Sequence, residues 1–354
     1  MIIHSRFKDY TVHKELTPDF LKQLCLTENA EFVIDKKVYG LYEKYFTEIP
    51  KERLCLIEAT EEHKVVETAL DICEKMTEIP AKRNARLVSV GGGIIQDITG
   101  FVANILYRGI AWTFVPTTLL ASCDSCIGGK TSLNYKKYKN LLGTFYPPDD
   151  IYICPAFFAT LSERDFESGL GEVVKFNIMA GASGLENIEK NIDLLLKRDN
   201  GCLQHFVETS LSFKKDFIEE DEFDKGERIK LNFAHTFGHA IETVTKYEIP
   251  HGTAVAIGMI MADSISVKRG LLSADTALRA EKVLLKVIHI NTDLGAYEIG
   301  DFINAMRKDK KQTSTDLTAV LMTDTAKDLK IVHDIKENDV ADALAHFVKV
   351  YNAR

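Results

Sequence analysis

The order of hydrophobic and polar positions changes part-way along the chain. In the first part, short apolar runs rich in β-branched residues alternate with segments of helical spacing. Residues 31–35 (EFVID) predict a strand, residues 61–76 predict a helix, and residues 86–106 predict a buried strand, a glycine turn and another helix. The apolar stripe of the helix at 61–76 consists of Val65, Val66, Ala69, Cys73 and Met76. This alternation is typical of a parallel sheet with crossover helices, in which ligands lie beyond the carboxyl ends of the strands.

From about Leu161 onward, amphipathic helical periodicity dominates the chain. The clearest helical segments are residues 167–179, 228–244 and 252–267. Near the end, residues 317–324 predict a short strand and residues 339–351 a final helix. We therefore expect a Rossmann-like α/β domain with a parallel sheet at residues 1–155, followed by a mainly α-helical domain at residues 156–354.

Composition and charge limit which partners the protein can bind and indicate its cellular compartment. The net charge of −8 argues against nucleic acid as a partner, and no apolar run resembles a signal peptide or a membrane helix. A cytoplasmic protein without a membrane contact is the expectation. The seven cysteines, an odd number at scattered positions, favour reduced thiols over disulfides. Cys123 and Cys126 are spaced as in a redox or zinc pair, but no second pair follows them.

A basic segment stands out in this acidic protein. Residues 128–140 (GGKTSLNYKKYKN) contain no acid and four lysines, which are Lys130, Lys136, Lys137 and Lys139. The segment is either a solvated loop or an anion site for a phosphorylated small molecule. The adjoining glycines favour the anion site.

Three glycines, Gly91 to Gly93, separate a predicted strand from a predicted helix. The run GGGIIQDITG lacks the glycine spacing of the dinucleotide-binding fingerprint, so on its own it is a weak signal. A strand, a turn that lets a ligand approach the backbone, and a helix are nevertheless the parts that bind a pyrophosphate. The alternative is a tight turn without a ligand.

Two histidines, His235 and His239, lie one helical turn apart in NFAHTFGHAIE. This spacing is that of a two-histidine metal clamp, although structural histidines on a helix are about equally common. His251 in IPHGTAV and Glu172 in GLGEVVKF add two further ligand types. One glutamate and two or three histidines can form a catalytic metal site with an open position, and spacing alone would choose His235 and His239 with Glu172.

Five blocks of sequence, taken together, resemble one enzyme family. They are GGGIIQDITGFVANILYRG, PTTLLASCDSCIGGKTSLNYKKYKN, LSERDFESGLGEVVKF, GERIKLNFAHTFGHAIE and HGTAVAIGM. The chain resembles 3-dehydroquinate synthases and the wider sugar phosphate cyclase family over about residues 60 to 325. Several blocks in one order are far more specific than any single block.

The resemblance implies a homodimeric lyase of the shikimate pathway that converts 3-deoxy-arabino-heptulosonate 7-phosphate to 3-dehydroquinate and releases phosphate. NAD takes a hydride and returns it within each turnover, and zinc, with cobalt as the alternative metal, polarises the alcohol that is oxidised. A substrate with a carboxylate and a phosphate also needs several cations, which the lysine-rich segments supply.

The resemblance also implies roles for individual residues. The implied metal ligands are Glu172, His235 and His251, whereas His239 contacts the substrate. The implied NAD-binding positions are Asp35, Glu61, Lys64, Gly92, Gly93, Asp97, Thr117, Thr118, Asp124, Lys139 and Thr160. The implied substrate positions, besides His239, are Lys130, Asn140, Lys175, Lys214, Arg228, Asn232 and Lys311 or its neighbour Lys310. Arg108 matches an arginine that reaches the phosphate held by the neighbouring subunit, which is why a dimer is expected.

Several positions depart from the family pattern. Gln96 replaces a glycine, Lys37 replaces an asparagine, Thr253 replaces a glutamate, and the segments NYKKYKN and GTFYPP are unusual. None of these changes removes an implied metal or substrate group, so they indicate a divergent branch. The nearest alternative is a cyclase for another sugar phosphate, but relatives with other substrates tend to change the position of Asn232, which keeps its amide here.

Three alternatives come from other classes. A glycerol dehydrogenase-type oxidoreductase shares the glycine turn, but its metal set contains aspartate, so Glu172 and the lysine cluster argue against it. A zinc hydrolase would need a glutamate at Thr236, inside the HTFGH run. A sugar-phosphate- or metal-binding protein without catalysis is the last alternative.

Overall fold

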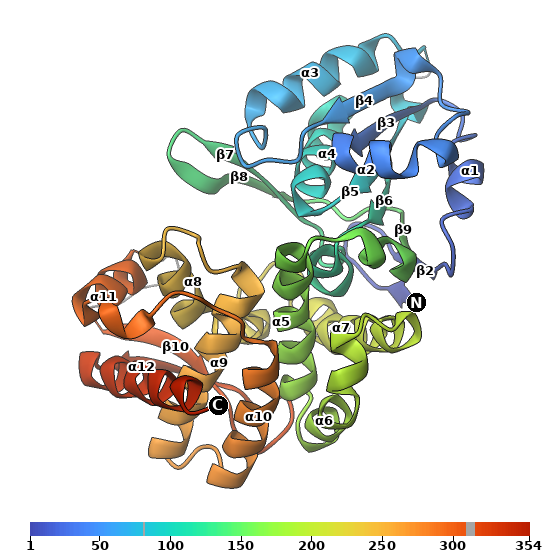
Figure 1. Ribbon diagram of the computed structural model, residues 1–354. Coiled ribbons are helices and arrows are strands. Elements are labelled where there is room, and N and C mark those ends of the chain that lie inside the picture. Colours follow the sequence, from blue (N-terminus) through green and yellow to red (C-terminus); the bar gives the residue numbers. More distant parts are fainter. Residues whose placement is uncertain (81, 309–315) are drawn as a thin grey trace. The chain divides into compact units, whose positions relative to one another are not determined.

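The structure, a computed structural model, describes residues 1–80, 82–308 and 316–354. The described chain divides into two compact units, Met1–Leu161 and Ser162–Arg354 (Figure 1). The first unit contains a largely parallel sheet and the second consists mainly of helices, which confirms the fold class predicted from the sequence. Among the described residues, no helix combines the length and hydropathy that a membrane crossing requires.

A seven-stranded sheet forms the centre of the first unit in the residues described. Its strands, in spatial order, are β1 (Ile2–Ile3), β2 (Tyr10–Lys14), β9 (Asp150–Ile153), β6 (Ala111–Pro116), β5 (Arg86–Gly91), β3 (Ala30–Asp35) and β4 (Leu54–Ile57). The β1–β2 pair is antiparallel, and the other neighbouring pairs run parallel. The apolar run of β3 is buried at Phe32, Val33 and Ile34, as expected for a parallel strand covered on both faces.

Helices and a β-hairpin complete the first unit. They are α1 (Phe20–Leu24), α2 (Lys36–Tyr42), α3 (Val66–Thr77), α4 (Gly93–Ile105), and the hairpin strands β7 (Lys130–Tyr135) and β8 (Tyr138–Phe145). Short 3-10 helices span Glu43–Tyr45, Lys51–Arg53, Lys82–Asn84, Leu106–Arg108 and Pro155–Thr160, and a π-helical turn spans Ala121–Ser125. In the described residues all seven cysteines are free thiols, as predicted.

The helix predicted at residues 61–76 begins later than expected. α3 starts at Val66, because the preceding backbone pairs with the hairpin: Asn134 N–H donates to the Lys64 carbonyl at 2.7 Å. The predicted stripe was also partly wrong. The buried face consists of Ala69, Ile72 and Met76, and it packs toward α4. The sequence offers two overlapping apolar stripes, and packing selects one of them.

The second unit is a helical assembly with a small antiparallel sheet. Its helices are α5 (Glu163–Met179), α6 (Ala182–Leu196), α7 (Asn200–Glu220), α8 (His235–Val244), α9 (His251–Lys268), α10 (Ala274–Val287), α11 (Ile299–Arg307) and α12 (Glu337–Asn352). The strands are β10 (Leu317–Leu321) and β11 (Lys330–Ile335), and 3-10 helices span Glu227–Asn232 and Leu294–Ala296. β10 and α12 confirm the strand and the final helix predicted near the end of the chain.

Helix α9 is the centre of the second unit. It packs against α5, α8, α10 and α12, and residues 252–263 are buried without interruption, so the expected amphipathic pattern was wrong here. α5 and α9 approach backbone to backbone: a Cβ on Gly171 would lie 2.0 Å from the Gly252 carbonyl oxygen, and one on Gly252 would lie 2.0 Å from that of Ser168. This crossing brings the backbones of α5 and α9 into direct contact at Gly171 and Gly252.

The segment predicted as one helix at residues 228–244 is broken. The 3-10 helix ends at Asn232, Ala234 adopts a left-handed conformation with φ of 68°, and α8 begins at His235. The Ala234 carbonyl lies against Gly258 of α9, where a Cβ would approach it to 2.5 Å. Helical periodicity continues through the break, which is why the sequence did not predict it.

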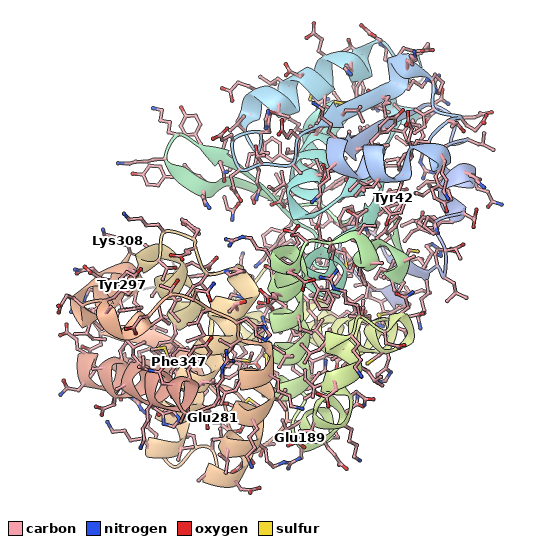
Figure 2. The ribbon with its side chains drawn as sticks, viewed as in Figure 1. Tyr42, Glu189, Glu281, Tyr297, Lys308 and Phe347 are labelled. Carbon is pink, nitrogen blue, oxygen red and sulfur yellow. The ribbon has the colours of Figure 1, made fainter. Side chains whose placement is uncertain are left out.

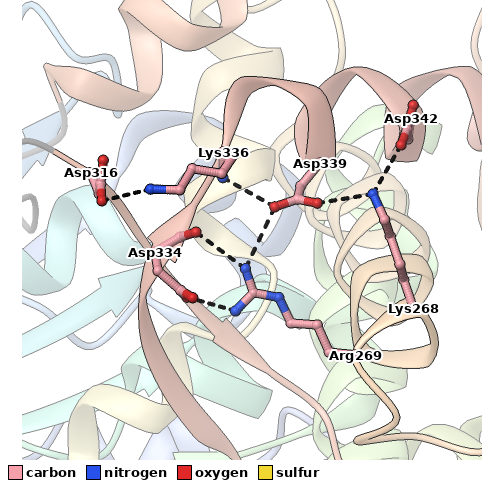
Figure 3. Close-up of polar contacts among 7 residues, drawn as sticks. All are labelled: Lys268, Arg269, Asp316, Asp334, Lys336, Asp339 and Asp342. Carbon is pink, nitrogen blue, oxygen red and sulfur yellow. Dashed lines mark hydrogen bonds and ion pairs between the residues drawn. The ribbon is translucent and has the colours of Figure 1, made fainter.

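Charged side chains tie the end of α9 to β11 and to the start of α12 (Figure 3). Lys268 contacts Asp339 at 3.1 Å and Asp342 at 3.0 Å, and Arg269 contacts Asp334 at 2.6 Å. Lys268 and Asp342 are largely exposed, so these pairs orient the helix ends and contribute little stability.

Candidate metal, cofactor and substrate sites

Three side chains from three helices converge in the second unit. Glu172 comes from the middle of α5, while His235 and His251 are the first residues of α8 and α9. Glu172 Oε1 lies 3.3 Å from His235 Nε2 and 3.5 Å from His251 Nε2. These atoms all lie within 4.8 Å of one another, so the structure groups the three residues that the resemblance implied as metal ligands.

Each imidazole is held by its other nitrogen. His235 Nδ1 lies 3.0 Å from the Phe233 carbonyl oxygen, so it is the protonated nitrogen and Nε2 presents a lone pair. His251 Nδ1 lies 3.2 Å from Glu242 Oε2, which orients that ring in the same way. Glu242 was missed by the sequence analysis, although it is the last residue of the NFAHTFGHAIE run.

The carboxylate of Glu172 divides its two oxygens between different partners. Oε1 faces the imidazoles, and Oε2 lies 2.5 Å from the Lys175 ammonium, which also donates to the Leu231 carbonyl at 3.1 Å. Burial is the largest single influence and favours the neutral acid, but the Lys175 charge and the contacts with His235 and His251 together outweigh it and hold the pKa of Glu172 well below its usual range. Glu172 is therefore an anion, as a carboxylate that binds a metal must be.

The two histidines have opposite electrostatic environments. Burial, aided by the charge of Lys175, lowers the pKa of His235 to about 3, so this ring is neutral. Burial also disfavours the charged form of His251, but its contacts with Glu172 and Glu242 outweigh burial and raise its pKa to about 10. A metal at this site would therefore displace a proton from His251.

The geometry of these three residues fits a tetrahedral metal. Ligands at zinc distances of about 2.0–2.1 Å are separated by about 3.3 Å along a tetrahedral edge, which matches the two carboxylate–imidazole separations. The side chain of Glu172 has no exposed surface, whereas those of His235 and His251 are 12% and 28% exposed. The histidine side thus remains accessible to a substrate or water.

His239 belongs to a second possible metal-binding group, which shares His251 with the first. Its ring centre lies 5.3 Å from that of His235 and 5.9 Å from that of His251, and it forms a possible ligand set with Glu242 and His251. The clamp of His235 and His239 with Glu172, which spacing alone would choose, is not the grouping found in the described residues.

The other predicted substrate residues of the second unit lie on α7 and the 3-10 helix Glu227–Asn232. Lys214 and Arg228 are buried cations, and the elements that carry them pack together. The Arg228 guanidinium donates to the Glu222 carbonyl at 2.5 Å, and the Asn232 amide donates to the Ile229 carbonyl at 3.0 Å. Lys310 and Lys311 lie outside the described residues.

In the first unit, the three glycines occupy the carboxyl end of β5, as predicted. A Cβ on Gly91 would overlap Ile95, and one on Gly92 would lie 3.0 Å from Thr118. A Cβ on Gly93 would meet nothing nearer than the Ser125 hydroxyl at 3.7 Å, so that glycine is not required by the packing within the unit. Thr117 adjoins the turn, because its N–H donates to the Gly91 carbonyl at 2.9 Å.

Gln96, one of the positions noted as unusual in the sequence, is buried in α4. Its side-chain amide donates to the Ser125 carbonyl at 2.6 Å, and the Ser125 hydroxyl donates back to Gln96 Oε1 at 2.6 Å. This reciprocal pair accounts for a long polar side chain at a position that is 2% exposed.

A polar network fixes the hairpin against α4. Lys64 lies 2.5 Å from Asp97 Oδ2 and donates to Asn140 Oδ1 at 2.6 Å. Ser132 donates to the same two side chains at 3.1 and 3.0 Å. Asn134 donates to Glu61 Oε2 at 2.7 Å and accepts from the Asn140 backbone. Predicted residues from distant segments thus form one cluster, to which the sequence analysis had not assigned Ser132 and Asn134.

The other predicted site residues of this unit are described outside this cluster. Asp35 ends β3 and accepts from the Lys37 N–H at 2.9 Å. The Thr160 hydroxyl lies 3.0 Å from that of Tyr42, the residue labelled in Figure 2. Asp124 lies in the π-helical turn, and Arg108 is exposed at the end of the 3-10 helix after α4. Lys130 begins β7 and Lys139 lies on β8, while Lys136 and Lys137 form the hairpin turn.

Comparison with known proteins identifies the family. Residues 54–168 match the 3-dehydroquinate synthase N-terminal family, and residues 169–312 match the 3-dehydroquinate synthase C-terminal family. The 3-dehydroquinate synthase of Dictyoglomus thermophilum is 37% identical over 333 residues, which cover 93% of this chain and 92% of that protein. The chain belongs to the 3-dehydroquinate synthase family. The resemblance seen in the five sequence blocks is thereby confirmed.

Solved structures of sugar phosphate cyclases share the fold. The 2-epi-5-epi-valiolone synthase of Streptomyces hygroscopicus subsp. jinggangensis, with NAD+ and Zn2+ bound, is 25% identical with a TM-score of 0.82 over 98% of this chain and 99% of that chain. A 2-deoxy-scyllo-inosose synthase complexed with carbaglucose-6-phosphate, NAD+ and Co2+ is 21% identical with a TM-score of 0.83 over the same shares.

Proposed function

We propose that this chain is a 3-dehydroquinate synthase that converts 3-deoxy-arabino-heptulosonate 7-phosphate to 3-dehydroquinate and phosphate. The observation that carries the proposal is the grouping of Glu172, His235 and His251 in a chain of this family, with Lys175 buried beside the carboxylate. A charged carboxylate and two oriented imidazoles suit a catalytic metal with an open position. The reaction places the enzyme in the shikimate pathway.

The metal and the cofactor are assigned to different units. Glu172, His235 and His251 would hold zinc or cobalt, which would supply polarisation of an alcohol oxygen of the substrate. NAD would lie at the glycine turn of Gly92 and Gly93, where the backbone beside Gly93 is open, and would supply the hydride acceptor and donor. Thr117, Thr118, Asp97, Asp124 and Lys139 are the positions expected near its phosphates and nicotinamide; Asp35, Glu61, Lys64 and Thr160 complete the cofactor set.

The cations serve the anionic groups of the substrate. Lys175, Lys214 and Arg228 are buried, and a buried cation is stabilised when an anionic ligand pairs with it. Asn232 and His239 contribute polar contacts and, for His239, a group able to move a proton. Lys130, Asn140 and Lys311 complete the substrate set, and Arg108 contacts the phosphate bound by a second copy of the chain in a homodimer.

A second candidate is a cyclase for a different sugar phosphate, because the solved relatives with this fold include such enzymes. Asn232, which retains the amide expected for dehydroquinate synthases, favours the heptulosonate substrate. Offering the enzyme the heptulosonate phosphate and glucose 6-phosphate in parallel separates the candidates, since only one substrate should release phosphate at a high rate.

The decisive experiment follows nicotinamide absorbance and phosphate release together. Because hydride is taken and returned within one cycle, phosphate should accumulate over many turnovers while the absorbance of NADH stays flat. 3-Dehydroquinate should form in equal amount to phosphate. Steady NADH production without phosphate would instead identify an oxidoreductase of the glycerol dehydrogenase type and overturn the proposal.

A further inference from the structure

The hairpin of β7 and β8 (Figure 1) contains a bulge at two of the predicted site residues. The cross-strand pairs on either side of the bulge are Leu133 with Leu142 and Tyr135 with Tyr138, so one residue of β7 lies opposite three residues of β8. The residues of this hairpin bulge are Asn134 on β7 and Lys139, Asn140 and Leu141 on β8. Because a bulge redirects the side chains of the strand that carries the extra residues, it determines where Lys139 and Asn140 point.

The backbone of Asn140 is held by a buried side chain of the facing strand. Asn140 has a φ of 51°, a left-handed conformation that asparagine adopts more readily than most residues. Its backbone N–H donates to Asn134 Oδ1 at 2.9 Å. Asn134 Nδ2 donates to the Glu61 carbonyl at 3.1 Å and to Glu61 Oε2 at 2.7 Å. Asn134 is 7% exposed and uses both ends of its amide, so it ties the hairpin bulge to the segment before α3.

The side-chain amide of Asn140 has one orientation that its neighbours allow. Its Oδ1 accepts from the Lys64 ammonium at 2.6 Å and lies 3.0 Å from the Ser132 hydroxyl. An ammonium group can only donate hydrogen bonds, so the oxygen of the amide, and not its nitrogen, must face Lys64. Lys64 and Ser132 both also contact Asp97 Oδ2, at 2.5 and 3.1 Å, which holds the two donors in place.

This orientation leaves the amide nitrogen of Asn140 available to a ligand. Asn140 is exposed, and its Nδ2 forms no hydrogen bond to the described part of the chain. An amide nitrogen presents two hydrogens and no lone pair, so it can only be completed by an acceptor. The hydroxyl, carbonyl and phosphate oxygens of a sugar phosphate are acceptors of this kind, whereas an ammonium group is not.

We propose that Asn134 and Ser132 are positioning residues for Asn140, which fix its backbone and its amide so that Nδ2 donates to an oxygen of the substrate. Asn134 acts on the backbone of Asn140, and Ser132 acts on its amide oxygen through the hydroxyl proton that it shares between Asn140 and Asp97. The inference rests on the proposed function for the identity of the substrate, whereas the positioning itself can be measured without a substrate.

Hydrogen exchange of the Asn140 backbone amide tests the positioning by Asn134. In the full chain containing isotope-labelled asparagine, NMR should show that this amide exchanges about tenfold faster in N134A than in wild type, because its hydrogen bond is lost. K137A changes an exposed residue of the hairpin turn and should exchange as wild type does. Thermal unfolding checks that both variants fold. An unchanged exchange rate in folded N134A would overturn the positioning by Asn134.

Steady-state kinetics with the heptulosonate phosphate test the consequence for the substrate. N134A should raise KM about tenfold and change kcat by less than about threefold, because a misplaced Asn140 loses a binding contact. A merely structural role would lower kcat through a smaller folded fraction and leave KM unchanged. Wild-type KM in a folded N134A with faster exchange would overturn the contact between Asn140 and the substrate.

The Ser132 variants provide a test that does not depend on the folding of N134A. S132A should raise KM about fivefold, and S132T, which keeps the hydroxyl, should return it to within about twofold of wild type. Equal KM values for S132A and wild type would overturn the role of Ser132. Absence of phosphate release by wild type would instead contradict the proposed function, and the exchange rates would still decide whether Asn134 positions Asn140.

Discussion

Both carboxylate oxygens of Glu172 have charged or polar neighbours in the metal cluster. One oxygen faces two imidazoles and the other faces Lys175, so a carboxylate with no exposed surface is compensated on both sides. A buried carboxylate without such partners would be neutral and a poor ligand. The neighbours thus determine the charge state on which metal binding depends, and they include Glu242, which acts through His251.

The amount of zinc bound by alanine variants distinguishes the metal ligands from the residues around them. H235A and H251A should lose stoichiometric zinc, because each removes an Nε2 donor, whereas H239A should keep about one zinc per chain and lose turnover. E242A should bind zinc about 10–100-fold more weakly, since His251 would lose the contact that orients it. Chelator competition with atomic absorption measures each value. Equal loss of zinc in H239A would instead favour the ligand set of His239, Glu242 and His251.

A second prediction concerns Glu31, the second residue of β3. It is 1% exposed, its Oε1 has no hydrogen-bond partner among the described residues, and burial raises its pKa from 4.5 to about 7. The folded state therefore holds this proton more tightly than the unfolded state. The corresponding stability is fully present below about pH 4 and is lost as pH rises to about 7.

Urea unfolding of wild type and E31Q at several pH values tests this linkage. The stability of wild type relative to E31Q should fall by about 3 kcal/mol between pH 4 and pH 8. E62Q, at an exposed glutamate, should follow wild type at every pH. Parallel curves for wild type and E31Q would show that Glu31 keeps an ordinary pKa.

At the scale of elements, the crossing of α5 and α9 positions the metal cluster. Gly171 precedes Glu172, and Gly252 follows His251, so the point of closest helix approach lies beside two of the three grouped side chains. Neither glycine could have been assigned this role from the sequence, because close packing between helices depends on residues far apart in the chain. The break at Ala234 and the uninterrupted burial of residues 252–263 in α9 escaped prediction for the same reason, whereas β3, β5, α4 and α12 follow from local periodicity alone.

Alanine at either glycine should force the two helices apart. G171A and G252A should each lower the free energy of unfolding by at least about 2–3 kcal/mol and weaken zinc binding, because a methyl group would overlap backbone that cannot move independently. G300A in α11 is the matched control: a Cβ there meets nothing within 4 Å, so it should stabilise the chain by about 0.5–1 kcal/mol. Denaturation and zinc titration measure both effects. Full stability in G171A would show that the helices can separate at no cost.

At the scale of the molecule, the two polar clusters described above lie in different units. The glycine turn and the network around Asp97 belong to Met1–Leu161, and the metal cluster belongs to Ser162–Arg354. The residues in distinctive motifs, such as the glycine turn and the HTFGH run, were predictable from the sequence. Ser132, Asn134 and Glu242 were not, because a serine, an asparagine or a helical glutamate carries no signal until its neighbours in space are known.

Hydrogen exchange should report the two ligands separately. Removing zinc with a chelator should raise exchange in α5, α8 and α9, and adding NAD should lower exchange in residues 91–97 and 117–125, because a ligand stabilises the segments that bind it. Mass spectrometry of peptides resolves these regions. A uniform rise in exchange across both units on chelation would mean that the metal controls the stability of the whole chain.

The reciprocal pair of Gln96 and Ser125 makes substitutions at the two positions interdependent. A glutamine without the serine would leave a buried carbonyl oxygen without a donor, at a cost of about 1–3 kcal/mol. A serine without the glutamine would be nearly neutral, because its hydroxyl can bond to the carbonyl of its own helical turn. We therefore expect epistasis between them: Q96G should be tolerated in the present background, whereas S125A should be tolerated only when Gln96 has been replaced as well.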